Sequence, residues 1–224
     1  MVVAIDGPAG AGKSTLARAL SRELRWRHLD SGAMYRCVGL MSLSSEEPPG
    51  ELARAAKIEL GDRVLLDGRD VTAEIRTAEV SEASSRVAAD PAVRRALVAH
   101  QRALLEQGDW VAEGRDIGTV VAPDAALKLF LIASVDERAR RRAAQTGADL
   151  RTELAAQAER DDRDTSREDS PLEPAADATV IDTTPMTVEE LVHRVVGMVR
   201  AAAYPATRNA TATGDPPARP RDGE

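Results

Sequence analysis

The stretch "GPAGAGKS", from Gly7 to Ser14, follows the apolar run of residues 2–5 and precedes a helical pattern over residues 15–24. Its spacing, Gly-x-x-x-x-Gly-Lys-Ser between a strand and a helix, is that of a P-loop. The glycines let successive backbone N–H groups turn inward toward phosphate oxygens, and the helix N-terminus adds a partial positive charge. A lysine and a hydroxyl in register argue against a plain connecting turn. The stretch therefore predicts a site for a nucleoside triphosphate, which we take to be ATP.

The residues expected to bind ATP are those of the loop and of the first helical turn: Gly7, Pro8, Ala9, Gly10, Ala11, Gly12, Lys13, Ser14 and Thr15. Lys13 would supply a point charge for the β- and γ-phosphates, and the Ser14 hydroxyl would be a ligand of Mg²⁺. P-loops also serve GTPases, which read guanine through an Asn-Lys-x-Asp motif. The only asparagine of the chain is Asn209, near its C-terminus, so the GTPase class is excluded.

The composition bounds the class of protein. The 224 residues are 43% hydrophobic and 30% charged, which suits one domain, with or without an insert. The formal net charge of −7 argues against a general affinity for nucleic-acid polymers. Cys37 is the only cysteine, which excludes an internal disulfide and a cysteine-built metal site. No apolar stretch approaches the roughly 20 residues of a membrane helix and no signal-peptide pattern opens the chain, so we expect a cytoplasmic monomer without membrane contact.

Strand-like runs alternate with helical patterns along most of the chain, which predicts a parallel α/β sheet flanked by helices. Strands are expected over residues 2–5, 110–114, 127–133 and 178–182, and helices over residues 15–24, 33–43, 78–89, 92–106 and 188–199. The stretch "IELGDRVLLDGRDVTAEIRT", residues 58–77, has strand-like pieces and turn dipeptides and predicts a small hairpin-like insert. Residues 203–224 are rich in proline and poor in apolar residues, which predicts a disordered tail.

Three further stretches carry polar side chains that suit an acceptor site. In "DSGAMYR", residues 30–36, Ser31 suits a helix start, whereas Arg36 could also fork a phosphate. In "EGRDIGTVV", residues 113–121, Arg115 and Asp116 follow a buried strand, so they either face the ligand crevice or form a local salt bridge. "ERDDRDTSR", residues 159–167, alternates in charge, and such runs are usually solvated helix faces.

In this order and at these intervals, "GPAGAGKST", "LDSGAMYR", "EIRT", "EGRDIGTVV" and "ERDDRDTSR" closely resemble the bacterial cytidylate (CMP/dCMP) kinases. The resemblance extends from about residue 2 to residue 200. It implies a P-loop nucleoside monophosphate kinase domain over residues 1–202, with a monophosphate-binding insert at about 44–90 and a lid at about 138–160. It also implies phosphorylation of CMP and dCMP by ATP, through in-line transfer with Mg²⁺.

The resemblance also implies a role for individual residues. The acceptor phosphate would be bound by Arg36, Arg115 and Arg167, and the ribose hydroxyls by Arg160 and Asp164. Cytosine would be read by Ser85, Arg94 and Asp116, in a pocket lined by Ser31 and Tyr35. The catalytic cations would be Lys13, Arg115, Arg167 and the lid residues Arg138 and Arg142, with Arg141 also near the transferring phosphoryl group.

These assignments suit the chemistry of the base. Cytosine offers an amino donor beside ring and carbonyl acceptors, so its reader needs an acceptor such as Asp116 and a donor such as Arg94. Ser84 and Ser85 are adjacent, and the spacing to "RVAA" selects Ser85. Two alternatives stay open: the acceptor is UMP or a non-nucleotide hydroxyl, or ATP is only a regulatory ligand.

Overall fold

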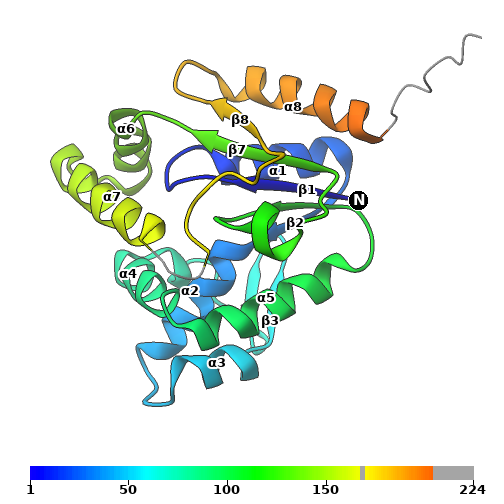
Figure 1. Ribbon diagram of the computed structural model, residues 1–224. Helices are drawn as coiled ribbons and strands as arrows, with labels where there is room; N and C mark the ends of the chain where they lie inside the picture. Colours follow the sequence, from blue (N-terminus) through cyan, green and yellow to red (C-terminus); the bar gives the residue numbers. More distant parts are fainter. Residues whose placement is uncertain (167–169, 204–224) are drawn as a thin grey trace, which may run out of the picture.

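The computed structural model describes residues 1–166 and 170–203 and is built around a five-stranded sheet (Figure 1). The strands are β1 (Val2–Asp6), β2 (Arg27–Asp30), β6 (Trp110–Glu113), β7 (Leu127–Ile132) and β8 (Thr179–Asp182). They run parallel in the order β2-β6-β1-β7-β8. The predicted parallel sheet flanked by helices is thereby confirmed. Arg167 and the expected tail, apart from Ala203, lie outside the described residues.

The position of β1 at the centre of the sheet sets the position of the P-loop. In β1, Ile5 lies beside Glu113 of β6, and Asp6 lies beside Phe130 of β7. The carboxyl ends of three parallel strands therefore meet directly below the loop that follows β1. Ligands of open α/β sheets bind beyond this edge, so the topology points to the site.

Helices cover both faces of the sheet (Figure 1). On one face lie α1 (Lys13–Leu24) and α8 (Val188–Ala203), and on the other lie α5 (Pro91–Leu105) and a short π-helical turn, η2 (Ile117–Val121). Side chains alternate along a strand. Val3 and Ile5 accordingly join the first core, whereas Ala4 joins the second. Within the described residues, no helix is both long and apolar enough to cross a membrane.

A separate apolar core lies below the sheet, where the insert is expected. It is formed by α2 (Ser31–Ser42), α3 (Pro49–Ala55), α4 (Ala78–Val87) and α5, together with a small antiparallel sheet. That sheet consists of β3 (Ile58–Leu60), β4 (Val64–Leu66) and β5 (Arg69–Asp70), and the 3-10 turn η1 (Glu74–Arg76) follows it.

Two helices stand side by side at the carboxyl edge of the sheet (Figure 1). They are α6 (Val135–Thr146) and α7 (Leu150–Thr165), and they include the residues expected to form a lid. Each begins at a side-chain cap: Ser134 accepts from the N–H of Glu137, and Asp149 accepts from the N–H of Thr152. The charged run "ERDDRDTSR" is only in part a solvated face, because Asp164 in it is buried.

Candidate active site

The loop after β1 has the backbone conformation of a phosphate cradle. Gly7, Gly10 and Gly12 have φ angles of 141°, 78° and 94°, which favour glycine. A side chain at Gly7 would also collide with the carbonyl oxygen of Leu131. The ammonium of Lys13 lies inside the loop and donates to the carbonyl oxygen of Pro8 at 2.7 Å. The loop thus curls around the cation that a phosphate would meet.

Lys13 is buried next to a second cation. Burial and the charge of Arg115 lower the pKa of Lys13 to about 7, although Glu113 and Asp164 act in the opposite direction. Placing two cations side by side in a low-dielectric site costs free energy unless an anion lies between them. A phosphate group would supply that anion, so this part of the site is electrostatically prepared for one.

Ser14 and Glu113 bring two oxygen ligands together beside the P-loop. The Ser14 hydroxyl donates to Oε2 of Glu113 at 2.6 Å, and Nε2 of His28 lies 3.0 Å from Oε1 of the same carboxylate. In nucleotide sites Mg²⁺ is held by one or two protein oxygens together with phosphate oxygens. The hydroxyl and the buried carboxylate fit such an ion. No cluster of three or more His, Cys, Asp or Glu residues suited to a metal occurs among residues 1–166 and 170–203.

The carboxylate of Asp6 fastens the loop after β6 to the end of β1. It accepts the backbone N–H groups of Ile117 at 2.8 Å and Gly118 at 2.7 Å. Burial raises the pKa of Asp6 to about 6, against the opposing effect of these two hydrogen bonds. Asp6 therefore holds Asp116, which immediately precedes the two amides, next to the P-loop.

Arg115 and Asp116 do not pair with each other. Nε of Arg115 donates to Oδ2 of Asp164 on α7 at 2.7 Å, whereas Asp116 pairs with Arg94 on α5. Burial alone would lower the pKa of Arg115, but the Asp164 carboxylate raises it above its ordinary value. The Arg94 and Asp116 side chains are each only 8% exposed. Arg115 and Asp116 therefore do not form the local salt bridge that was one of the two expectations. They form two long-range ion pairs instead, which join the loop after β6 to α7 and to α5.

The start of α2 faces the same edge. The Ser31 hydroxyl donates to the carbonyl oxygen of Glu113 at 2.7 Å, and Arg36 lies 3.5 Å from the Asp30 carboxylate. Burial and the charges of Arg18 and Arg36 lower the pKa of Arg76. Arg18, Arg36 and Arg76 are therefore close enough to repel one another, and a bound anion would relieve this repulsion.

Tyr35, predicted to line the cytosine pocket, is partly buried against the core below the sheet.

Two arginines of α6 connect the expected lid to the P-loop. Arg138 is 4% exposed and donates to the carbonyl oxygen of Ala9 at 3.2 Å and to the Asp161 carboxylate at 2.7 Å. Arg141 donates to the carbonyl oxygen of Thr183 at 2.7 Å, and the Thr183 hydroxyl donates to the carbonyl oxygen of Ala11 at 3.0 Å. Arg138 thus uses its donors on protein acceptors in this structure.

Arg142 and Arg160 are placed differently. Burial and the charge of Arg142, which lies on α6, lower the pKa of Arg160 on α7, so the two guanidinium groups are near enough to repel each other. Neither guanidinium donates a hydrogen bond to another described residue. They are therefore better placed than Arg138 to bind an anionic ligand.

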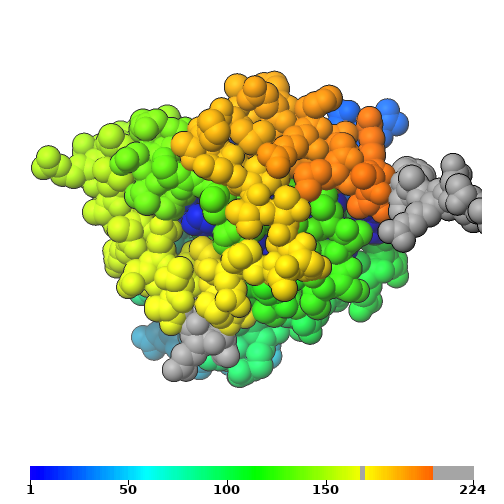
Figure 2. Space-filling view, turned by 45° about the horizontal axis from the view of Figure 1, so that its top comes forward, coloured from blue at the N-terminus to red at the C-terminus, as the bar shows by residue number. Residues whose placement is uncertain are grey.

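Many of the residues predicted for the site lie at one edge of the sheet. Figure 2 shows a hollow there, with deep-blue atoms of the N-terminal segment at its floor, between α6–α7 and the yellow segment that precedes β8. The P-loop, the start of α2 and the pairs Arg115–Asp164 and Arg94–Asp116 are connected by the contacts described above. Ser85 lies on α4, where it meets Arg163 of α7. Arg167 lies outside the described residues.

Four further residues of the site, Asp6, Glu113, Arg76 and Arg163, have no predicted role, although all four lie in or beside the quoted motifs. The signal for Asp6 and Glu113 is their position, since each ends a buried strand at the carboxyl edge of a predicted parallel sheet. No local signal exists for the partners that Arg76 and Arg163 find on other elements.

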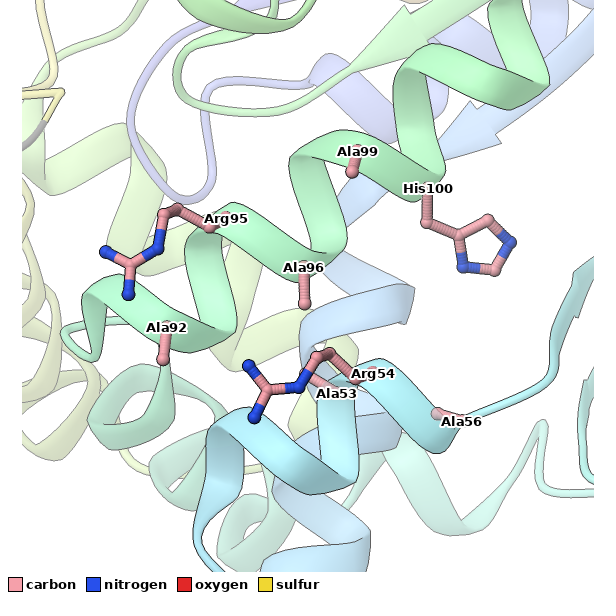
Figure 3. A pocket seen from close by; sticks show the side chains of 8 residues that line it. All are labelled: Ala53, Arg54, Ala56, Ala92, Arg95, Ala96, Ala99 and His100. Carbon is pink, nitrogen blue, oxygen red and sulfur yellow. The ribbon is translucent and has the colours of Figure 1, made fainter.

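A second hollow, of about 530 Å³, lies between α3 and α5 (Figure 3). Its lining is Ala53, Arg54, Ala56, Ala92, Arg95, Ala96, Ala99 and His100. None of these is a predicted site residue, and Arg54 is paired with Glu51. The chemistry-bearing residues lie instead at the carboxyl edge of the sheet.

Comparison with protein families gives a match over nearly the whole chain. The family model described as cytidylate kinase matches residues 3–201. The chain is 49% identical over 216 residues to a cytidylate kinase from Pelotomaculum thermopropionicum, covering 89% of this chain and 96% of the relative. It is 46% identical over 215 residues to a cytidylate kinase from Klebsiella pneumoniae (strain 342), covering 89% and 95%.

Solved structures match at lower identity. A gluconokinase from Sinorhizobium meliloti 1021 is 17% identical with a TM-score of 0.51, covering 93% of this chain and 97% of that one. An uncharacterized protein from Eubacterium ventriosum ATCC 27560 is 14% identical with a TM-score of 0.55, covering 90% and 99%. At these identities the likeness concerns the fold alone.

Proposed function

The chain belongs to the cytidylate kinase family, and from this premise we propose that it transfers the γ-phosphoryl group of ATP to CMP and dCMP, forming CDP or dCDP and ADP. The observation that carries the proposal is the closeness of two cations, the buried Lys13 of the P-loop and the partly buried Arg115 of the loop after β6. One cation belongs to the donor side and the other to the acceptor side. Two anionic nucleotides brought into line need fixed cations at that junction.

On the donor side, the P-loop amides and Lys13 hold the ATP phosphates. Ser14 and Glu113 supply oxygens that suit Mg²⁺, which when bound would neutralise charge on the phosphate oxygens. The Thr183 hydroxyl links the P-loop to the end of β7. Its oxygen lies 3.0 Å from the carbonyl oxygen of Ala11 and 3.1 Å from the carbonyl oxygen of Ile132. This support keeps the cradle in place while ligands exchange.

On the acceptor side, Arg36 and Arg115 bind the phosphate of CMP, together with Arg167. The attacking group is a phosphate oxygen that is already ionised at neutral pH, so the reaction needs positioning and charge compensation more than proton transfer. Asp164 now neutralises Arg115. When the substrate phosphate takes over that role, Asp164 and Arg160 become available to the ribose hydroxyls.

Asp116 and Arg94 read the base, as an acceptor for the cytosine amino group and as a donor. Their ion pair holds both side chains in a fixed orientation before the substrate arrives. Such preorganisation lowers the entropy cost of binding.

The helices α6 and α7 act as the lid over about residues 138–160, and residues 44–90 act as the monophosphate-binding part. Closure of the lid excludes water, which would otherwise accept the phosphoryl group and waste ATP. Arg142 and Arg160 would approach the nucleotide phosphates on closure. We also propose that the enzyme is a cytoplasmic monomer. It acts on small nucleotides rather than nucleic-acid polymers, because its net charge of −7 disfavours binding to polyanions.

The test is ADP release from ATP and Mg²⁺ with a panel of acceptors: CMP, dCMP, UMP, AMP, shikimate and none. The expected result is rapid release with CMP and dCMP, slower release with UMP, and background release with the others. Release that is equal with and without acceptor would show that the chain is an ATPase or binds ATP for regulation. A preference for shikimate would replace the nucleotide acceptor by another hydroxyl compound.

A further inference from the structure

Arg163, on the lid helix α7, reaches across to α4 and meets Ser85. Its Nη1 donates to the Ser85 hydroxyl oxygen at 3.0 Å and to the Glu82 carboxylate at 3.2 Å. Nη2 lies 2.8 Å from the Glu159 carboxylate, one turn earlier on α7. The side chain is 27% exposed, so it lies between the two helices with its charge held by two carboxylates.

The two neighbouring serines of α4 are not equivalent. The Ser84 hydroxyl donates to the carbonyl oxygen of Ser81 at 2.8 Å, and its backbone packs against Gly39 of α2. The Ser84 hydroxyl therefore donates its hydrogen bond within α4 and is not available as a donor to a ligand. Among the described residues, the Ser85 hydroxyl makes one hydrogen bond, in which it is the acceptor.

The contact with Arg163 decides which way the Ser85 hydroxyl can act. A guanidinium has only donors, whereas a hydroxyl has one donor and two acceptor positions. While the Ser85 oxygen accepts from Arg163, its proton points away and is available to an acceptor on another molecule. Arg163 therefore favours Ser85 as a donor.

Cytosine and uracil differ in the hydrogen bond that their ring nitrogen N3 can form. The ring nitrogen N3 of cytosine is an acceptor, whereas N3 of uracil carries a hydrogen and is a donor. A hydroxyl held as a donor can bond to N3 of cytosine but faces the hydrogen of uracil. A hydroxyl free to rotate can serve either base.

We propose that Arg163 is a specificity-determining positioning residue, which orients the Ser85 hydroxyl as a donor and so favours CMP over UMP. This rests on the proposed CMP kinase function and on the contact of Ser85 with cytosine that the family resemblance implies. Arg163 acts through Ser85 and touches no substrate. Because Arg163 belongs to α7, the base is read fully only when α7 lies against α4, and Glu82 holds it there. Lid position and base discrimination are thereby coupled.

The test compares kcat/KM for CMP and for UMP in Arg163→Met, which keeps the apolar stem but removes every donor. The CMP/UMP ratio should fall about three- to tenfold, the range that one hydrogen bond spans. Arg163→Lys should keep most of the wild-type CMP/UMP ratio, because a lysine ammonium, like a guanidinium, can only donate hydrogen bonds. Arg151→Met is the matched control, because Arg151 is an exposed arginine on the same helix. It should leave the ratio unchanged.

A second comparison separates positioning from a general effect on the lid. In a Ser85→Ala background, Arg163→Met should no longer change the ratio, because the hydroxyl it orients is absent. Equal losses for CMP and UMP, or a fall in the ratio that persists without Ser85, would overturn the proposal. Wild-type protein that makes no CDP at all would instead refute the proposed function. Circular dichroism and urea unfolding check that each variant is folded.

Discussion

Replacement of Asp116 by Asn changes two things at once, because its carboxylate both pairs with Arg94 and is proposed to accept from the cytosine amino group. The side chain keeps its size and shape. One of its acceptor oxygens becomes an amide donor, and its negative charge is lost. The effects on stability and on base discrimination therefore differ in kind and can be measured separately.

The loss of stability follows from the burial of the pair. Both side chains are 8% exposed, so removal of the charge leaves a buried guanidinium without this carboxylate. Breaking a buried ion pair from one side typically costs about 3–5 kcal/mol, and since Asn retains one acceptor oxygen we expect about 3 kcal/mol. In a domain of this size the melting temperature should fall by roughly 6–12 °C.

The loss of discrimination follows from the base. UMP presents a carbonyl where CMP presents its amino group, so the new amide donor suits UMP better. A hydrogen bond to a charged group is worth about 1.5–3 kcal/mol, so the CMP/UMP ratio of kcat/KM should fall roughly ten- to a hundredfold.

The assay is the initial rate of ADP release with each monophosphate at saturating ATP, well below the melting temperature of the variant. Arg36→Ala is the control, since it should weaken both monophosphates by a similar factor through the phosphate they share. If Asp116→Asn slows CMP and UMP equally, Asp116 holds Arg94 and the loop in place but does not read the base.

Three further predictions concern the cradle, the strand end and the lid. Lys13→Ala should lower kcat by at least about a hundredfold without loss of folding stability, because the charge is needed most in the transition state; turnover within tenfold of wild type would contradict this. Burial raises the pKa of Asp6 from 3.8 to about 6, so the folded protein binds a proton more tightly than the unfolded chain. The stability of wild type relative to Asp6→Asn should therefore fall by up to roughly 3 kcal/mol as pH rises from about 3 to 7. Urea unfolding across this range checks it, and a constant difference would refute the raised pKa. Amide hydrogens of α6 and α7 should exchange more slowly with ATP and CMP together than with either alone; equal protection in all states, measured by mass spectrometry, would indicate a fixed helix pair.

The sequence predicts the elements whose signals are local. The P-loop and the buried strands on either side of it are visible because each combines an apolar run with a turn or motif at fixed spacing. The strand β2 was missed because "RHLD" has no apolar run. It is an edge strand in which only Leu29 is fully buried, and it is held by pairing with β6.

The helix α3 was missed for another reason. "SSEEPPG" has the composition of a turn, but Pro49 occupies the first helical position, where its missing N–H is not needed. The helix is then stabilised by packing against α5, which no local pattern reveals.

The candidate site shows the same limit at the level of side chains. The motifs identify Arg115 and Asp116, but their partners lie 49 and 22 residues away, on α7 and α5. Charge runs such as "ERDDRDTSR" contain several equivalent arginines and acids. Which of them becomes buried and paired is decided by how α7 packs, so Asp164 and Arg163 acquire their contacts only in the folded chain.

Transfer of the γ-phosphoryl group to CMP can be followed directly with ATP labelled at that phosphate. The purified protein is incubated with labelled ATP, Mg²⁺ and CMP, and the products are separated by ion-exchange chromatography. The label should appear in CDP, in an amount equal to the ADP formed, and Lys13→Ala should abolish its appearance. Label recovered only in inorganic phosphate, or retained in ATP while CMP stays unchanged, would contradict the proposed kinase activity.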